Sequence, residues 1–184
     1  MRAEQPVSEE ACHRTGVLEE ERRPGAEPSA LCDDAFLVLV TTLRPGSASR
    51  NARAAVRGAL GRAGVCAEEI GDAEIIVAEL AANSEKYSHG PYELRIHCLS
   101  GIPMWCEMVD GEHDLGRIPT ILAGLHTPVD RDLTPFAESG RGLLLAHKLS
   151  HGRCYAYPTT MSACGSAGKA VAFALPAPSG DAVG

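Results

Sequence analysis

Along the chain, the spacing of hydrophobic and polar residues alternates between the two-residue period of strands and the longer period of helices. A short apolar run at 36–42 is closed by Pro45 and Gly46, a pattern that predicts a strand. Ala and Arg recur at helical spacing over 47–62, and the longest helical pattern covers 67–87. The domain is therefore expected to begin with one strand and two helices.

The pattern that follows predicts mainly strands. Alternating segments at 92–99 and 102–109 flank a Ser-Gly turn, which predicts a half-buried antiparallel hairpin. Residues 112–139 contain Pro and Gly breaks and little periodicity, so we expect a long loop there. The last predicted elements are a short helix and two strands, at 142–149, 152–157 and 169–175.

Composition divides the chain into one domain and two tails. Residues 1–30 are rich in Glu, Arg and Pro and have almost no aliphatic run, so we expect a disordered acidic N-terminal tail. Residues 177–184 have the same character, and 31–176 are expected to form a single domain. With 17 Lys and Arg against 24 Asp and Glu, the net charge is −7, which argues against a nucleic-acid groove.

The sequence also predicts where the protein acts. No window approaches the roughly 20 apolar residues of a membrane span. The acidic N-terminal segment lacks the apolar core of a signal peptide. The seven Cys residues have no CxxC spacing, which is typical of reduced thiols rather than of a zinc site or a disulfide framework. We therefore expect a cytoplasmic protein without membrane contact.

Three polar side chains form one stripe on the longest predicted helix. Glu79, Asn83 and Lys86 are spaced i, i+4 and i+7, and this stripe borders the apolar face. Carboxylate and carboxamide oxygens suit Mg²⁺, and an ammonium suits phosphate. The alternative, which the stripe taken alone favours, is a partly buried row of hydrogen-bonded side chains that only supports the helix. The solvent-facing positions are expected to be Glu74, Ala78 and Glu85.

Asp110 continues the core-facing side of the second hairpin strand. A carboxylate in that position costs several kcal/mol unless it has a partner, and the exocyclic amine of a nucleotide base would be one. The alternative is an Asp-Gly turn in which Asp110 accepts hydrogen bonds from nearby backbone amides.

A glycine-containing segment, Ser139-Gly140-Arg141-Gly142, precedes the short helix predicted at 142–149. Free amides at a helix N-terminus attract phosphate, and glycine allows close approach of the backbone. The segment lacks the Gly-Lys-[Ser/Thr] of a P-loop, and GALGRAG at 58–64 lacks the spacing of a dinucleotide fingerprint. The alternative is an ordinary helix start capped by Ser139.

Taken in this order, the features resemble the histidine-kinase-like ATPase superfamily, also called GHKL or the Bergerat fold. The segments AELAANSEKYS, ESGRGLLLAHKLS and GKAVAFAL carry the resemblance, which spans about 53–175. Within the superfamily, the chain is most similar to the anti-sigma-factor serine/threonine kinases, especially to short actinobacterial ATP-binding proteins. The resemblance implies an α/β two-layer sandwich (α+β), with a mostly antiparallel mixed sheet and helices on one face.

The resemblance also implies roles for individual residues. Asn83 corresponds to the residue that holds Mg²⁺, and Glu79 corresponds to the general base of the kinase members. Lys86 corresponds to the basic residue that approaches the phosphates, and Asp110 to the acceptor of the adenine amine. Residues 112–139 would be the ATP lid. The residues of the second glycine box would be Ser139, Gly140, Arg141 and Gly142.

The implied function is that of an ATP- and Mg²⁺-binding anti-sigma-like regulator that phosphorylates a Ser or Thr of an antagonist (anti-anti-sigma) protein. Its other partner would be a sigma factor, and a homodimer is a further expectation from the resemblance. The alternative is a catalytically inactive module that regulates transcription by sequestering a protein partner. A sensor-kinase ATPase fragment is a third interpretation, but no phospho-acceptor histidine helix is predicted before the domain.

Three positions depart from the family pattern. Gly111 follows Asp110 directly, one position earlier than in the usual Asp-x-Gly. A Thr that commonly helps to position the base is replaced by Ala170, and a Trp frequent in actinobacterial members corresponds to Ala172. These departures are the reason for keeping the sequestering module as the alternative.

Overall fold

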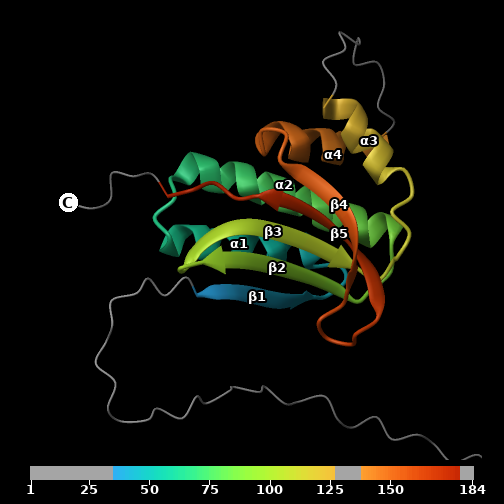
Figure 1. Ribbon diagram of the computed structural model, residues 1–184, viewed down its shortest axis with the longest axis horizontal. Coiled ribbons are helices and arrows are strands. Elements are labelled where there is room, and N and C mark those ends of the chain that lie inside the picture. Colours follow the sequence, from blue (N-terminus) through green and yellow to red (C-terminus); the bar gives the residue numbers. More distant parts are fainter. Residues whose placement is uncertain (1–34, 127–137, 179–184) are drawn as a thin grey trace, which may run out of the picture. The chain divides into compact units, whose positions relative to one another are not determined.

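A computed structural model describes residues 35–126 and 138–178. The expected N-terminal tail at 1–30, most of the tail expected at 177–184, and residues 127–137 of the expected lid lie outside the described residues. The described residues form an α+β unit with a five-stranded sheet and four helices (Figure 1). In chain order the elements are β1 (Phe36–Leu43), α1 (Ala48–Arg62), α2 (Ala67–Tyr87), β2 (Tyr92–Leu99), β3 (Ile102–Asp110), α3 (Ile118–His126), α4 (Glu138–Leu149), β4 (Cys154–Thr160) and β5 (Ala167–Ala174).

The sheet has the strand order β1-β2-β3-β5-β4, and each pair of neighbouring strands is antiparallel. The expected sheet was mixed, so the described strands correct that detail. The predicted hairpin is present, and its turn residues Ser100 and Gly101 have φ values of 50° and 80°. Two consecutive positive φ angles match the twist of antiparallel strands. On its other side, β3 pairs with β5, and its last residue, Asp110, lies opposite Lys169.

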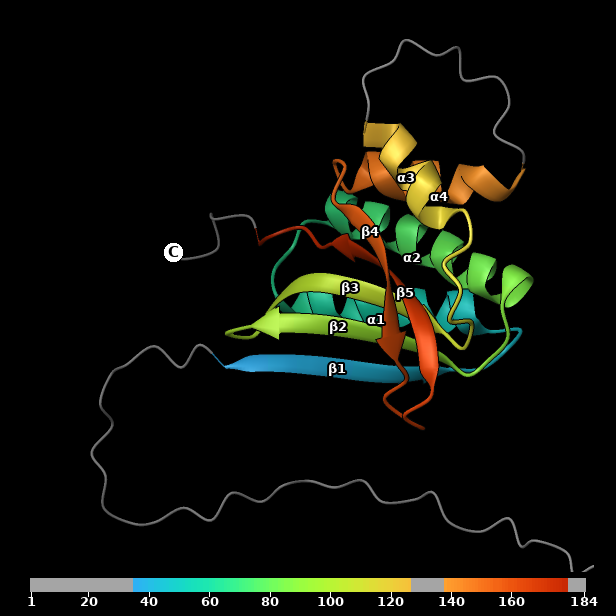
Figure 2. The same ribbon diagram turned by 45° about the vertical axis from the view of Figure 1, so that its right-hand side comes forward.

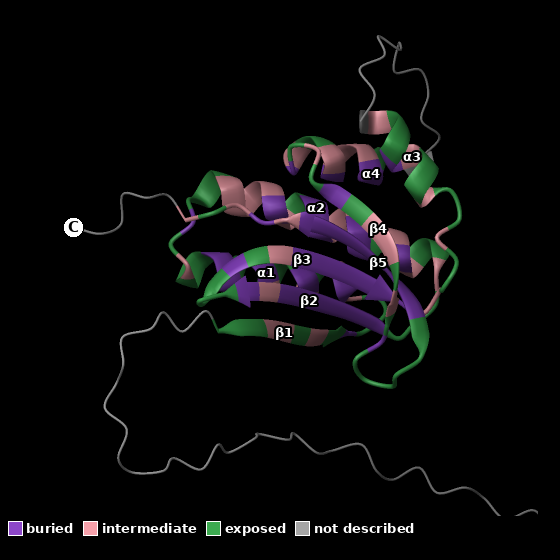
Figure 3. Ribbon diagram, viewed as in Figure 1, coloured by how far each residue is buried: buried purple, intermediate pink, exposed green. Residues whose placement is uncertain are grey.

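The helices cover one face of the sheet, as the family resemblance implied. Figures 1 and 2 show α1 and α2 on the same side of β2 and β3, with α4 packed on α2 and α3 packed on α4. The large apolar residues of β2, β3 and β5 alternate toward these helices, and Figure 3 shows the buried positions concentrated in these strands. The central core side chains are Val56, Leu60, Ile76, Val77, Leu80, Leu94, Met108 and Phe173.

The side of α2 that carries Glu74, Ala78 and Glu85 does not face solvent, contrary to the prediction. Arg57 of α1 donates to Glu74 (2.8 Å), and the Ser49 hydroxyl donates to the carbonyl oxygen of Ala78 (3.1 Å). Because α1 and α2 lie side by side on the sheet, each helix buries the side that faces the other helix as well as the side that faces the core. The exposed positions in the middle and last turns of α2 are Ile75, Ala82, Lys86 and Tyr87.

Two other expectations need correction near the predicted lid. Residues 118–126 form α3 rather than a loop, because Pro119 lies in the first turn, where its missing N–H is tolerated. Leu122 of α3 is buried in the core. The fourth helix begins at Glu138 rather than at 142, so the serine and glycines of its first turns lie within the helix. Ser139 therefore does not precede the helix as a cap.

On the face of the sheet away from α1 and α2, charged side chains are buried under the turn between β4 and β5. Glu93 is fully buried and accepts the backbone N–H groups of Ser162 (3.0 Å) and Ala163 (2.9 Å). Arg95 forms an ion pair with Glu93 (2.9 Å) and donates to the carbonyl oxygen of Thr160. This cluster holds the β4–β5 turn against β2.

Within the described ranges, none of the helices combines the length and the apolar character that a bilayer span demands.

Candidate functional site

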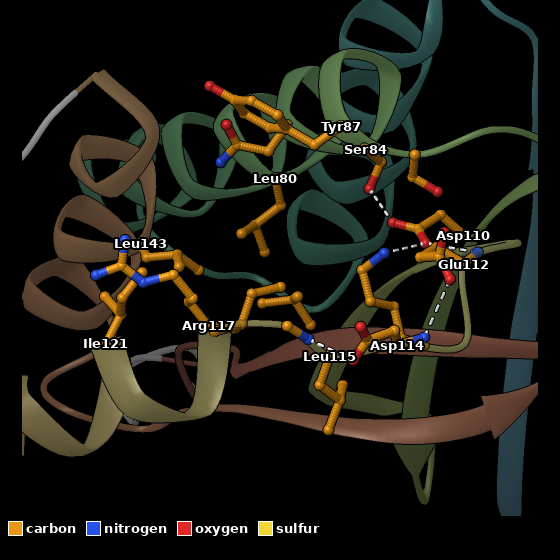
Figure 4. Close-up of a pocket in the computed structure, with 16 residues that line it drawn as sticks. Leu80, Ser84, Tyr87, Asp110, Glu112, Asp114, Leu115, Arg117, Ile121 and Leu143 are labelled. Carbon is orange, nitrogen blue, oxygen red and sulfur yellow. Dashed lines mark hydrogen bonds and ion pairs between the residues drawn. The ribbon is translucent and has the colours of Figure 1, made fainter.

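A cavity of about 310 Å³ lies between α2, the ends of β3 and β5, and the segment that leads into α3 (Figure 4). One part of its lining is apolar and the other part is polar. The volume and the mixed lining are typical of a site for a small, partly polar molecule. The apolar walls are Leu80, Leu115, Ile118, Ile121, Leu143 and Val171.

Asn83 and Asp110 both line this cavity, although they are far apart in the sequence. Asn83 lies near the end of α2 and is half-buried. Asp110 is the last residue of β3, and only 3% of its surface is exposed. The cavity wall is continuous between them, because Ser84, the neighbour of Asn83, is buried and hydrogen-bonded to Asp110.

The carboxylate of Asp110 has three hydrogen-bond donors. The Ser84 hydroxyl donates to Oδ2 (2.9 Å), and Lys169 Nζ lies 2.7 Å from Oδ1. The backbone N–H of Glu112 also donates to Oδ1 (3.1 Å), as the Asp-Gly turn alternative predicted. The buried carboxylate is therefore stabilised by a cation, a hydroxyl and an amide, and it still faces the cavity.

The structure explains why glycine follows Asp110 directly, at position 111. A Cβ at Gly111 would lie 3.1 Å from the carbonyl oxygens of both His89 and Gly90. The Gly111 N–H also donates to the carbonyl oxygen of His89. The turn after β3 thus packs against the segment between α2 and β2, and only glycine fits there without a shift of backbone.

The residue of β5 at the cavity is not Ala170, the position that the family resemblance matched to a base-positioning Thr. Ala170 lies on the opposite face of the sheet, where it packs with Val109 and Met161. Lys169, which the sequence analysis did not select, is opposite Asp110 and lines the cavity. The two-residue period contained this information, because Lys169 shares a face with the core residues Val171 and Phe173.

Glu79 lies one helical turn before Asn83 and contacts the beginning of α4 rather than the cavity. A Cβ at Gly142 would lie 2.6 Å from Asn83 Nδ2 and 3.2 Å from Glu79 Oε2. The backbone of α4 therefore packs directly on the predicted polar stripe. Glycine at 142 is required by this close approach, whether or not it also serves a ligand.

This packing predicts the effect of a single added methyl group. Gly142→Ala should reduce the free energy of unfolding by about 1–3 kcal/mol relative to Gly61→Ala, because the methyl group overpacks against Asn83 and Glu79. Gly61 is a matched control in α1, since its Cβ would meet nothing within 4 Å. Both variants gain the same helix propensity. Urea unfolding of the two variants measures the difference, and equal stabilities would refute the close contact.

The remaining predicted site residues are not all brought together. Lys86 is exposed, its ammonium lies 5.1 Å from the centre of the Tyr87 ring, and it does not line the cavity. Ser139 and Gly140 belong to the first turn of α4, followed by the exposed Arg141. Sequence reasoning thus placed two of its residues at the cavity, and a third next to it.

Charged residues from the segment after β3 also line the cavity. The N–H of Asp114 donates to Glu112 Oε1 (3.2 Å) and thereby lowers the pKa of Glu112 from its usual value. The cavity wall contains three carboxylates, of Asp110, Glu112 and Asp114, against the two cations Lys169 and Arg117. A polyanion would therefore enter more readily together with a cation.

No protein-family model and no curated protein matches the sequence. Among the residues that the structure describes, no group of three or more His, Cys, Asp and Glu side chains is arranged to hold a metal ion.

Proposed function

We propose that the chain is a GHKL-type regulator with a Bergerat ATP-binding fold, which binds ATP and Mg²⁺ and acts in the cytoplasm as a serine/threonine protein kinase on an antagonist protein. The observation that carries the proposal is the shared cavity of Asn83 and Asp110. The α+β arrangement, with helices on one face of an antiparallel sheet, is compatible with that fold.

The polar end of the cavity suits the hydrogen-bonding edge of a nucleotide base, and the apolar walls suit the two faces of its ring. Asp110 is buried and has acceptor capacity on its carboxylate, so it is suited to an exocyclic amine. Leu80, Ile121 and Val171 are among the apolar side chains that would contact the faces of a heteroaromatic ring. A cavity with one polar end orients such a ring in a single direction.

The carboxamide of Asn83 is suited to hold Mg²⁺ through its oxygen. Magnesium in nucleotide sites is usually bound by one or two protein oxygens, with phosphate oxygens and water completing the shell. The excess of carboxylates around the cavity favours a polyphosphate that carries such a cation. When bound, Mg²⁺ would offset negative charge on the phosphoryl group that is transferred.

Glu79 is the proposed general base, because it is one helical turn from Asn83 on the same face of α2. Its role would be to accept the proton of the acceptor hydroxyl of the antagonist protein. The free amide of Gly140 in the first turn of α4, with Ser139, Arg141 and Gly142 beside it, is the proposed phosphate-binding group. Lys86 is the proposed basic residue beyond the cavity.

The proposal includes two protein partners, a sigma factor and an anti-anti-sigma antagonist, and a homodimer. The strand β1 offers one surface for association, because it is an edge strand without any charged residue. Its side chains of Phe36 and Val40 are 66% and 46% exposed.

Magnesium dependence of ATP binding tests the proposal. ATP at 100 times its dissociation constant should raise the free energy of unfolding by about 2.7 kcal/mol. We expect this stabilisation to weaken when EDTA removes Mg²⁺, and to lose its Mg²⁺ dependence in Asn83→Ala. Ala82→Ser is the control on the exposed side of α2. Stabilisation of Asn83→Ala that still depends on Mg²⁺ would refute the role of Asn83.

One observation favours the alternative, a module that sequesters a partner without catalysis. Asp110 already has Lys169 and Ser84 as partners, and α4 packs on Asn83. The carboxylate of Asp110 is therefore paired, and Asn83 is packed against α4, without a nucleotide. This alternative would be favoured if the chain binds a protein partner while ATP neither stabilises the chain nor releases the partner.

A further inference from the structure

Lys169 is a cavity residue to which the family resemblance gave no role, and it lies beside Asp110 at the polar end. Its side chain is 9% exposed and the side chain of Asp110 is 4% exposed, and its ammonium lies 2.7 Å from Asp110 Oδ1. Both residues line the cavity. A donor and an acceptor are therefore presented side by side, and each is held by the other.

The acceptor capacity of Asp110 is nearly exhausted. A carboxylate offers about four acceptor sites. Lys169 and the Glu112 amide use two sites on Oδ1, and the Ser84 hydroxyl uses one on Oδ2. One acceptor site remains, on Oδ2. An ammonium has three N–H donors, of which the ion pair uses one, so Lys169 retains donor capacity.

This count distinguishes the purine bases. Adenine presents one donor, its 6-amino group, next to one acceptor, the ring nitrogen N1. Guanine presents a carbonyl acceptor followed by two donors, N1–H and the 2-amino group. The single remaining acceptor site of Asp110 satisfies adenine but leaves one guanine donor unpaired in a buried site, which disfavours binding.

We propose that Lys169 is a base-specificity residue, which donates a hydrogen bond to N1 of adenine while Asp110 accepts one from the 6-amino group. This inference rests on the proposed ATP binding and adds a direct protein contact to a second atom of the base. The ion pair with Asp110 fixes the position of the ammonium, so the donor is oriented before the ligand arrives.

A change in the ligand tests the contact without disturbing the protein. The full chain is titrated calorimetrically with ATP, with 1-deaza-ATP, in which a C–H replaces N1, and with 7-deaza-ATP as the matched control. Loss of a hydrogen bond from a charged donor should weaken binding of 1-deaza-ATP by about 10- to 100-fold. 7-Deaza-ATP should bind as ATP does, and GTP should bind at least about tenfold more weakly than ATP.

The Lys169→Met variant completes the comparison. In this variant, ATP and 1-deaza-ATP should bind with affinities within about threefold of each other, because the protein then presents no donor to N1 of ATP. Equal affinity of the wild-type chain for ATP and 1-deaza-ATP would overturn the role of Lys169 and leave the proposed function intact. Failure of the wild-type chain to bind any of the nucleotides would overturn the proposed function itself.

Discussion

Glu79→Gln should lower the rate of phosphate transfer to the antagonist protein by about 10²- to 10⁴-fold, the usual contribution of a general base. The substitution keeps the size of the side chain, so its contact with Gly142 of α4 should persist. It removes only the ability to accept a proton. ATP affinity should change little, because the side chain of Glu79 does not line the cavity.

The measurement is the initial rate of transfer of labelled γ-phosphate to proteins that co-purify with the chain. Glu68→Gln is the matched control, since Glu68 is an exposed glutamate in the first turn of the same helix. An unchanged rate in Glu79→Gln, with normal rates in the control, would rule out the catalytic role of Glu79.

Glu93→Ala should reduce the free energy of unfolding by about 3–5 kcal/mol, the largest effect on stability that we expect. The substitution leaves the guanidinium of Arg95 buried without its main partner. It also removes the acceptor of the Ser162 and Ala163 amides, which hold the β4–β5 turn. A loss of this size is a large part of the total stability of a domain.

A double variant separates the cost of an unpaired charge from the contribution of the pair. Glu93→Leu combined with Arg95→Met should be more stable than Glu93→Ala, because neither charge then remains buried alone. Urea unfolding measures all three proteins. A double variant that is less stable than Glu93→Ala would contradict this explanation.

The same cluster predicts sensitivity to acid. Burial by itself would raise the pKa of Glu93, but the amides of Ala163 and Ser162 and the guanidinium of Arg95 hold this pKa below the usual 4.5. A lowered folded-state pKa means that the unfolded chain binds the proton more tightly. The contribution of Glu93 is therefore complete above about pH 4.5 and is lost as the pH falls through the folded-state pKa. Unfolding curves of wild type and Glu93→Ala should converge in acid.

The elements with strong local signals were predicted well. The bounds of α2 are those that its helical pattern gave, and the β2–β3 hairpin follows from alternation on both sides of a two-residue turn. Asp110 was predicted on the core face for the same reason. These predictions hold because the period of a single element decides which side chains share a face.

The failures involve contacts between distant parts of the chain. Which side of α2 is exposed depends on where α1 packs. The burial of Glu93 depends on the β4–β5 turn, about 70 residues later in the chain. Neither position is set by the local pattern, so Glu93 resembles an ordinary outward-facing strand residue. The missed helix α3 has a Pro and a Gly in nine residues, which outweighed its apolar positions.

The central claim is that a nucleotide occupies the cavity between α2, β3 and α3, and calorimetric titration with ATP and Mg²⁺ tests it most directly. The wild-type chain should release saturable heat with one nucleotide per chain. Ile121→Trp, which fills the cavity from α3, should abolish this heat while the protein remains folded in thermal unfolding. Absence of heat from the wild-type chain at millimolar ATP, or undiminished binding by Ile121→Trp, would contradict the account.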